Sequence, residues 1–154
     1  MLEILYPRRC AVCDEIEVTG KGICPLCKDK VHVAGEPACK KCGKPLVDER
    51  KEFCTDCGKK HHVYTQGKAV FVYEGGIRNS MYRFKYGNKR EYAEFYANAA
   101  VEKYGVWLNK IKAEVLIPIP MYSRKKRLRG YNQAEVFARE LGRKAGILVD
   151  EHLV

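Results

Sequence analysis

Four Cys-x-x-Cys pairs near the N-terminus contain every cysteine of the 154-residue chain. The pairs are Cys10/Cys13, Cys24/Cys27, Cys39/Cys42 and Cys54/Cys57, separated by spacers of ten, eleven and eleven residues. Two thiolates three residues apart on a tight turn can hold one side of a metal ion, and a second pair completes a tetrahedron. Eight cysteines in this pattern therefore predict two four-cysteine zinc sites.

Other uses of paired cysteines compete with zinc. Four disulfides would suit a small secreted domain, but no secretory signal is recognisable before Cys10, and the cytoplasm is the expected compartment. A redox dithiol explains one pair and leaves three unexplained, and iron–sulfur clusters usually take other spacings. Zinc is the preferred interpretation. We expect His32, His61 and His62 to lie on the surface, because cysteines already satisfy both metals.

Two arrangements of the cysteine pairs are open. Consecutive use of the pairs gives two successive zinc ribbons, whereas interleaved use gives a cross-brace. We favour consecutive use because each short spacer can form a hairpin by itself. Residues 1–66 are rich in Lys, Glu, Gly and Cys, so metal is expected to supply folding free energy there. The apolar residues Leu2, Ile4 and Leu5 are expected to pack against the ribbons or the following domain.

Positive charge is concentrated in the second part of the chain. The formal net charge is +10, from 29 basic and 19 acidic side chains. Residues 1–66 hold 12 Lys or Arg and 10 Asp or Glu, whereas residues 67–154 hold 17 and 9. A zinc ion with four thiolates carries about −2, so two sites would lower the net charge to about +6. The basic segment suits phosphate groups, nucleic acid or an acidic membrane surface, although solubility alone is a simpler explanation.

From residue 67 onward, strand-like and helix-like patterns alternate, which predicts an α/β layered fold. The expected elements are a strand over 69–73, helices over 77–86 and 89–112, a strand over 115–120, a helix over 132–145 and a strand from 147. Asn132 is the expected N-cap of the last helix, with Glu135 at the capping-box position and Gly146 just after its end. No stretch has the length and apolarity of a transmembrane helix.

A cationic segment follows the predicted strand over 115–120. Parallel sheets bind ligands at the carboxyl ends of their strands, so residues 121–130 are expected to form a phosphate-binding loop. Arg can hold phosphate oxygens in a bidentate manner, and Lys adds a mobile charge. The candidate phosphate or nucleic-acid contacts are Arg124, Lys125, Lys126, Arg127, Arg129, Gly130 and, from the helix over 77–86, Lys85.

Four features together resemble the ComF family of competence-associated, phosphoribosyltransferase-like proteins. They are the Cys-x-x-Cys array, Val72-Tyr-Glu-Gly-Gly-Ile-Arg78 leading to Arg83-Phe-Lys-Tyr86, Leu116-Ile-Pro-Ile-Pro120, and Arg127-Leu-Arg-Gly-Tyr-Asn-Gln-Ala134. The resemblance covers the whole chain, and the last two segments together are its most specific part.

The resemblance implies a double zinc ribbon over 1–66 and the N-terminal part of a type I phosphoribosyltransferase-like α/β domain over 67–154. By that analogy, residues after Pro120 form the pyrophosphate-binding loop. Family members also carry an acidic pair followed by a Thr/Gly-rich loop that cradles phosphoribosyl pyrophosphate, and this sequence has no such loop. We therefore expect an incomplete domain, which could use Mg²⁺ and phosphoribosyl pyrophosphate only if it were completed.

Three functions are consistent with these observations. The preferred hypothesis, which the resemblance implies, is assistance in the uptake of single-stranded DNA during natural transformation, with a competence helicase as a candidate partner. In that case Tyr82, Tyr86, Tyr122 and Tyr131 would stack on bases near the cationic segment. The first alternative is a phosphoribosyltransferase enzyme. The second is a docking module, because zinc ribbons often bind other proteins.

Overall fold

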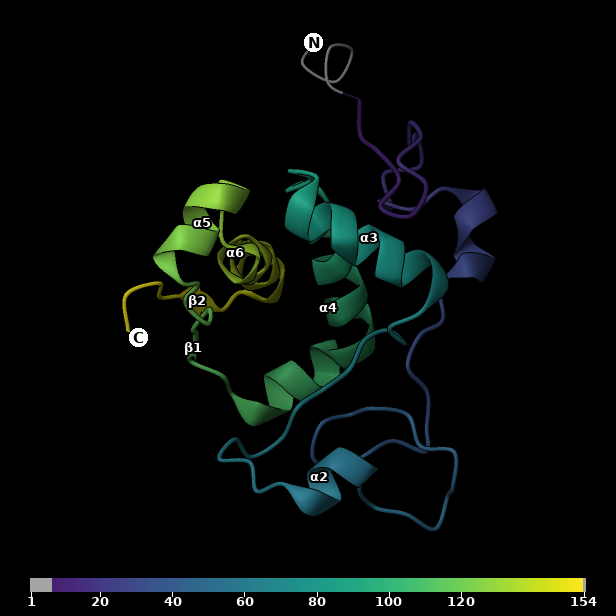
Figure 1. The fold of residues 1–154 in the computed structure, drawn as a ribbon, viewed down its shortest axis with the longest axis vertical. Helices are drawn as coiled ribbons and strands as arrows, with labels where there is room; N and C mark the ends of the chain where they lie inside the picture. Colours follow the sequence, from purple (N-terminus) through teal and green to yellow (C-terminus); the bar gives the residue numbers. More distant parts are fainter. Residues whose placement is uncertain (1–6, 154) are drawn as a thin grey trace.

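The computed structural model describes residues 7–153, which form a mixed fold of helices and short strands (Figure 1). The elements in chain order are the 3₁₀ helix η1 (Pro25–Lys30), α2 (Thr55–Lys59), α3 (Gly75–Tyr86), α4 (Tyr92–Ile111), β1 (Val115–Leu116), α5 (Ser123–Arg129), α6 (Gln133–Ala145) and β2 (Leu148–Val149). Leu2, Ile4 and Leu5, which were predicted to pack against the ribbons, lie outside the described residues. Within the described part of the chain, no helix is long and apolar enough to cross a membrane.

An aromatic core joins α3, α4 and the start of α6. Phe84, Tyr92, Phe95, Tyr96 and Tyr131 are each at most 6% exposed. The Phe84 ring centroid lies 5.4 Å from that of Tyr96 and 6.0 Å from that of Tyr131. Aromatic pairs at such separations stabilise a core beyond the area that they bury. These contacts fix α3 and α4 relative to the start of α6.

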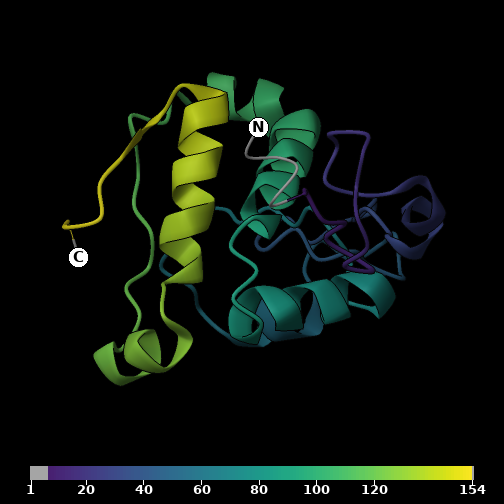
Figure 2. The ribbon, with the colours of Figure 1, turned by 90° about the horizontal axis from the view of Figure 1, so that it is seen from above.

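The two strands form a small parallel sheet. Val115 lies opposite Leu148, and Leu116 lies opposite Val149. The chain crosses from β1 to β2 through α5 and α6, as a parallel pair requires. Figure 2 shows α6 between these strands and α4, and α6 packs on both. The amphipathic pattern of α6 therefore has an apolar partner on each side.

The three predicted helices are confirmed, with shifted ends. α3 begins at Gly75 and α4 continues through Gly105 without a break. At the start of α6, the side-chain oxygen of Asn132 accepts a hydrogen bond from the backbone N–H of Ala134 at 3.0 Å. The Asn132 amide also donates to the Glu135 carboxylate at 3.2 Å. The sequence therefore predicted the start of α6 correctly.

The predicted strand over 69–73 is wrong. Phe71 makes only a single antiparallel bridge with Val33, beside a hydrogen bond from the Ala34 N–H to the Val70 carbonyl at 2.9 Å. The ring of Phe71 stacks on an aromatic side chain of α4. The side chain of Phe71 packs against the helical core. The backbone here pairs with the segment that precedes the second cysteine group, and not with β1.

The predicted loop over 121–130 is also wrong, because Ser123–Arg129 form the helix α5. The helix ends at Gly130, whose φ of +78° lies in the left-handed region that glycine favours. β1 covers only Val115–Leu116 of the predicted strand over 115–120. The cationic side chains are therefore presented by a helix that follows β1 after a short connection.

We expect Gly76→Ala to lower the free energy of unfolding by about 1–3 kcal/mol, the usual cost of overpacking. A Cβ at Gly76 would stand 2.8 Å from the Lys30 carbonyl oxygen and 2.8 Å from Cγ1 of Val12. The first cysteine group would have to move away from α3. Thermal and denaturant unfolding of the zinc-loaded protein measure this cost.

The control for this substitution is Gly105→Ala in α4. A Cβ at Gly105 meets only Cγ1 of Val101, at an ordinary contact distance of 3.7 Å. Alanine is the better helix former, so this variant should gain roughly 0.5–1 kcal/mol. Equal stability of the Gly76→Ala variant and the wild type would contradict the close packing of α3 on the first cysteine group.

Candidate metal centres and basic surface

The first candidate metal centre combines the first two Cys-x-x-Cys pairs. The Sγ atoms of Cys10, Cys13, Cys24 and Cys27 all lie within 4.8 Å of one another, and those of Cys13 and Cys24 are 3.8 Å apart. All four cysteines are free thiols. Tetrahedral Zn–S bonds of about 2.3 Å would place two sulfurs about 3.8 Å apart. The group therefore fits one zinc ion.

The second centre repeats this arrangement with the last two pairs. Cys39, Cys42, Cys54 and Cys57 also have all Sγ atoms within 4.8 Å, with 3.8 Å between those of Cys42 and Cys54. The predicted consecutive pairing is confirmed, and the interleaved alternative is wrong. Two four-cysteine groups thus fit two zinc ions, as the sequence predicted.

Both centres begin with the same backbone turn. The N–H of Asp14 donates to the Cys10 carbonyl at 2.9 Å, and the N–H of Gly43 donates to the Cys39 carbonyl at 2.8 Å. Asp14 and Gly43 both have left-handed backbone conformations, with φ of 69° and 75°. Glycine adopts this conformation without steric cost, and Asp is one of the few other residues that tolerate it. The first turn of each centre therefore has the same structure.

Backbone N–H groups stabilise the thiolate form of one cysteine in each centre. Burial would raise the pKa of Cys10, but N–H groups of Cys13, Cys24 and Val12 hydrogen-bond to its sulfur and lower the pKa to about 7. The same opposition of burial and backbone donors lowers the pKa of Cys39 to about 6. The thiolate is the form that binds metal, so each centre holds one cysteine that is ready to bind a divalent cation.

The first ribbon is attached to the helices through Asp14. Its carboxylate accepts a hydrogen bond from the Tyr92 hydroxyl at 2.6 Å and lies 2.8 Å from the ammonium of Lys89. Burial raises the Asp14 pKa, but these two partners outweigh it and hold the pKa below its ordinary value. Arg83 of α3 donates to the Val12 carbonyl at 3.0 Å. The sequence did not single out these residues, because only tertiary packing brings them together.

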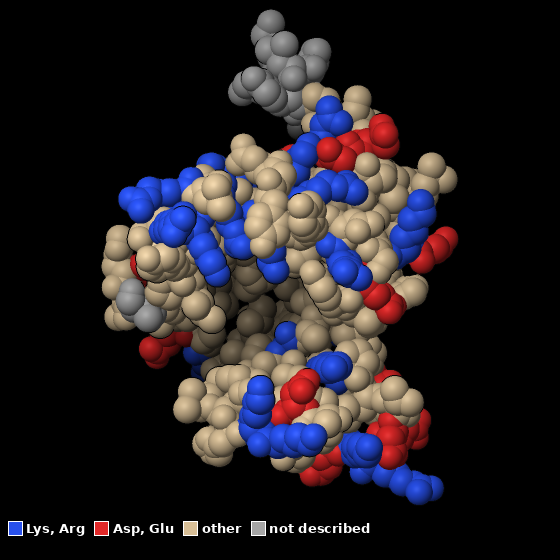
Figure 3. All heavy atoms as spheres, viewed as in Figure 1, with Lys and Arg blue, Asp and Glu red and all other residues tan. Residues whose placement is uncertain are grey.

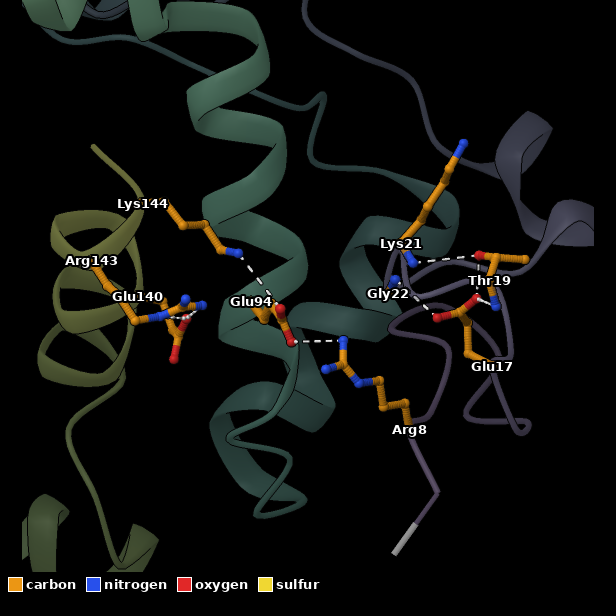
Figure 4. Close-up of polar contacts among 9 residues, drawn as sticks. All are labelled: Arg8, Glu17, Thr19, Lys21, Gly22, Glu94, Glu140, Arg143 and Lys144. Carbon is orange, nitrogen blue, oxygen red and sulfur yellow. Dashed lines mark hydrogen bonds and ion pairs between the residues drawn. The ribbon is translucent and has the colours of Figure 1, made fainter. Parts of the chain in front are cut away.

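Two further carboxylates fix the first ribbon (Figure 4). Glu17 is 4% exposed and accepts a hydrogen bond from the Gly22 N–H at 3.1 Å, which closes the loop between the first two cysteine pairs. Glu94 of α4 lies between two cations, 3.5 Å from Arg8 and 3.5 Å from Lys144 of α6. Glu94 therefore links the first ribbon, α4 and α6.

The second ribbon meets the helices mainly at its two ends. The ammonium of Lys103 in α4 donates to the carbonyls of Ala34, before the ribbon, and Ala69, after it. The Tyr104 hydroxyl donates to the same Ala69 carbonyl at 2.8 Å. The second ribbon extends away from the helices in Figure 1. The two ribbons therefore differ in how closely they join the rest of the fold.

The three histidines near the centres lie outside both four-cysteine groups. His32 and His61 are exposed and His62 is half-buried, close to the predicted surface positions. His32 Nδ1 lies 2.6 Å from a carboxylate oxygen of Glu74, the residue before α3. Cysteines alone therefore supply the four ligands of each group.

Three cations of α5 are free to meet an anion. Arg124, Lys125 and Arg127 are exposed, and none has a side-chain hydrogen bond or ion pair within residues 7–153. Figure 3 shows Lys and Arg atoms gathered over α5 and along α3. We call Arg124, Lys125 and Arg127 the α5 cluster. Because no acidic side chain within residues 7–153 pairs with these three cations, all three can bind an anion.

The other predicted contact residues have protein partners or lie further along this surface. Lys126 pairs with Glu135 at 2.9 Å. Arg129 donates to the Tyr86 hydroxyl at 2.9 Å, and its guanidinium lies 4.6 Å from the ring centroid. Lys85 is half-buried on α3 and has no side-chain partner among the described residues. Lys126 and Arg129 therefore position α5, whereas Lys85 extends the positive surface onto α3.

Three of the four tyrosines predicted to stack on bases are accessible. Tyr82, Tyr86 and Tyr122 are 66%, 57% and 70% exposed. Tyr131 is 5% exposed, and its hydroxyl donates to the Phe84 carbonyl in the core. The prediction that Tyr131 stacks on a base is therefore wrong.

The match to known families covers the N-terminal part of the chain. Residues 1–58 match a family model described as a double zinc ribbon domain. The sequence match and the two four-cysteine groups together define this part as a double zinc ribbon. No curated protein and no solved structure matches the chain. The ComF resemblance and the phosphoribosyltransferase-like assignment of residues 67–154 stay predictions.

Proposed function

We propose that this protein binds single-stranded nucleic acid, with a ComF-like role in the uptake of single-stranded DNA during natural transformation. The observation that carries the proposal is the α5 cluster, three exposed cations that have no side-chain partner within residues 7–153. Cations of this kind bind phosphates and release condensed counterions. A scattered solubilising charge would not require such a concentration on one short helix.

The aromatic side chains beside the cluster favour single strands over duplexes. The ring centroids of Tyr82 and Tyr86 are 5.0 Å apart on the exposed face of α3, and Arg129 joins Tyr86 to α5. Unpaired bases can stack on exposed aromatic rings, whereas the bases of a duplex already stack on one another. A positive surface with accessible rings is typical of proteins that bind single strands.

Binding of fluorescein-labelled oligothymidylate by the zinc-loaded protein tests the proposal. Fluorescence anisotropy should show affinity that falls steeply between about 50 and 200 mM salt. Replacing Arg124, Lys125 and Arg127 together by alanine should weaken binding. It should also lower the slope of log affinity against log salt by about 2, since each phosphate contact on a single strand contributes about 0.7.

A matched control removes the same charge elsewhere. Lys51, Lys59 and Lys60 are exposed on the second ribbon and have no side-chain partner among the described residues. Their joint replacement by alanine should leave most of the salt dependence intact. Equal losses in the two triple variants would mean that net charge, and not the α5 cluster, binds the oligonucleotide. Affinity that does not change with salt would contradict the proposal as a whole.

The second ribbon favours a second candidate function, docking to another protein. Val47 and Val63 are 104% and 98% exposed, and Phe53 is 45% exposed. Exposed apolar side chains of this kind often mark protein interaction sites. If a transformation helicase is the partner, Val47→Asp should abolish its co-purification with this protein and leave oligonucleotide affinity unchanged. Unchanged co-purification would contradict docking through this surface.

A further inference from the structure

An open cavity lies at the N-terminal end of α3, next to the basic surface. Its volume is about 530 Å³, and it is lined by Tyr73, Gly75, Arg78, Asn79 and Tyr82. Pockets that bind small molecules and cofactors typically have volumes of about 300–1,000 Å³. The cavity is therefore large enough for a nucleobase.

Two tyrosines supply the aromatic surface of this cavity. Tyr73 and Tyr82 are 63% and 66% exposed, and neither hydroxyl has a hydrogen-bond partner in the part of the chain that the structure describes. Exposed rings of this size leave much apolar area in water, so a planar ligand that covers them would be stabilised. Base stacking on aromatic side chains contributes about 1–3 kcal/mol per base.

Arg78 and Asn79 supply the polar groups. Both are exposed, and neither side chain has a hydrogen bond or an ion pair within residues 7–153. A carboxamide carries both a donor and an acceptor, so Asn79 can pair with the mixed donor and acceptor edge of a base. A guanidinium suits the adjoining phosphate. The helix α3 contains no Asp or Glu, and the carboxylate of Glu74, which precedes it, contacts His32 at 2.6 Å.

A row of side chains leads from the cavity toward α5 along one face of α3. Arg78, Tyr82 and Tyr86 are four residues apart, so they follow one another on the same face of the helix. Tyr86 then contacts Arg129 at the end of α5. The twelve residues of α3 span roughly 18 Å. Bases and phosphates of one strand could therefore meet rings and cations in turn along this path.

A neighbouring cavity suits a base less well. It has a volume of about 360 Å³, shares Tyr73, and is lined mainly by apolar side chains such as Phe71, Ile77 and Phe137. Without groups to satisfy the polar edge of a base, burial there would cost free energy. The cavity that contains Arg78 and Asn79 is the better candidate.

We propose that Tyr73, Arg78, Asn79 and Tyr82 form a binding site for an unpaired nucleobase of a single-stranded nucleic acid. This inference rests on the proposed function. The base stacks on the tyrosine rings, Asn79 binds its edge and Arg78 binds the adjacent phosphate. An unpaired base is available to stack on these rings, whereas a paired base already stacks within its duplex, so the site distinguishes single strands from duplexes.

The test compares fluorescein-labelled oligothymidylate of about 20 nucleotides, a length ample for one binding surface, with a duplex of the same length. The double variant Tyr73→Ala/Tyr82→Ala of the full zinc-loaded chain should bind the single strand at least about fivefold more weakly, the smallest loss expected for one stacked base. Its affinity for the duplex and its salt slope should match those of the wild type. Tyr82→Phe should bind the single strand normally, because the ring remains.

Tyr64→Ala is the matched control, because Tyr64 is 42% exposed and lies in the segment that follows the second cysteine group. It should not change affinity for either probe. Zinc content and thermal unfolding show whether each variant is folded. Wild-type affinity of the double variant for the single strand would overturn the base site and leave the α5 cluster proposal intact. Absence of binding by the wild type to either probe would overturn both.

Discussion

Replacing Cys10 by serine should reduce the zinc content from two ions to one and unfold much of the helical core. Ala11, the next residue, is fully buried in the core with Phe84, Tyr92 and Phe95. Structural zinc in small domains contributes about 10–16 kcal/mol of apparent binding free energy, comparable with the whole stability of a domain, about 5–15 kcal/mol. Loss of this centre would therefore release the ribbon residues that complete the core. Metal analysis and far-UV circular dichroism measure both effects.

Cys39→Ser is the control for this prediction. It should remove one zinc ion as well, but leave the helical signal close to that of the wild type. The second ribbon reaches the helices through a few polar contacts, such as those of Lys103 and the approach of Lys68 to the Trp107 ring at 5.4 Å. If both variants lost the same helical signal, the two ribbons would not differ in the way that the contacts indicate.

Truncating Phe84 to alanine should lower the free energy of unfolding by about 3–5 kcal/mol, the range for buried aromatic residues. Phe84 is 3% exposed and contacts Tyr96 and Tyr131. It also lines the apolar cavity between α3 and α6, so its removal would enlarge an existing void. For a chain of this size, the melting temperature should fall by roughly 10 °C.

The matching truncation at a more exposed position is Phe53→Ala. Phe53 is 45% exposed on the second ribbon, so less apolar area is lost and no internal cavity forms. The expected cost is below about 1 kcal/mol. Comparable losses for Phe53→Ala and Phe84→Ala would show that the aromatic core is not the main source of helical stability.

The features that the sequence predicted well depend on local chemistry. The cysteine spacing was enough to predict both metal centres, and the short spacers favoured the observed pairing of Cys10/Cys13 with Cys24/Cys27. The N-cap at Asn132 follows from its short polar side chain, which reaches a backbone N–H two residues on. Such features are encoded within a few residues, so no knowledge of the tertiary fold was needed.

The helix α5 could not be predicted in this way. Like charges four residues apart destabilise an isolated helix, and five of residues 124–129 are cationic. In the structure, Lys126 pairs with Glu135 of α6, and Arg129 contacts Tyr86 of α3. These partners lie in other helices, so their stabilising effect is absent from the local pattern.

The base site was also beyond the sequence pattern. Tyr73 precedes α3 and Tyr82 lies in its third turn, and only the turn at Glu74 and Gly75 brings both rings to one cavity. The strand-like residues around Phe71 were misassigned for a related reason. Their side chains suit a strand, but they pair with Val33 far earlier in the chain. Neither the shared cavity of Tyr73 and Tyr82 nor the pairing of Phe71 with Val33 produces a periodic pattern in the sequence.

The antiparallel bridge between Val33 and Phe71 has a consequence for how the chain could be rearranged. The Ala34 N–H and the Val70 carbonyl are hydrogen-bonded at 2.9 Å, so the path into the second ribbon and the path out of it run side by side. The second ribbon is therefore an insertion whose two ends lie side by side. A tight hairpin turn between Ala34 and Val70 could take its place without rerouting the backbone.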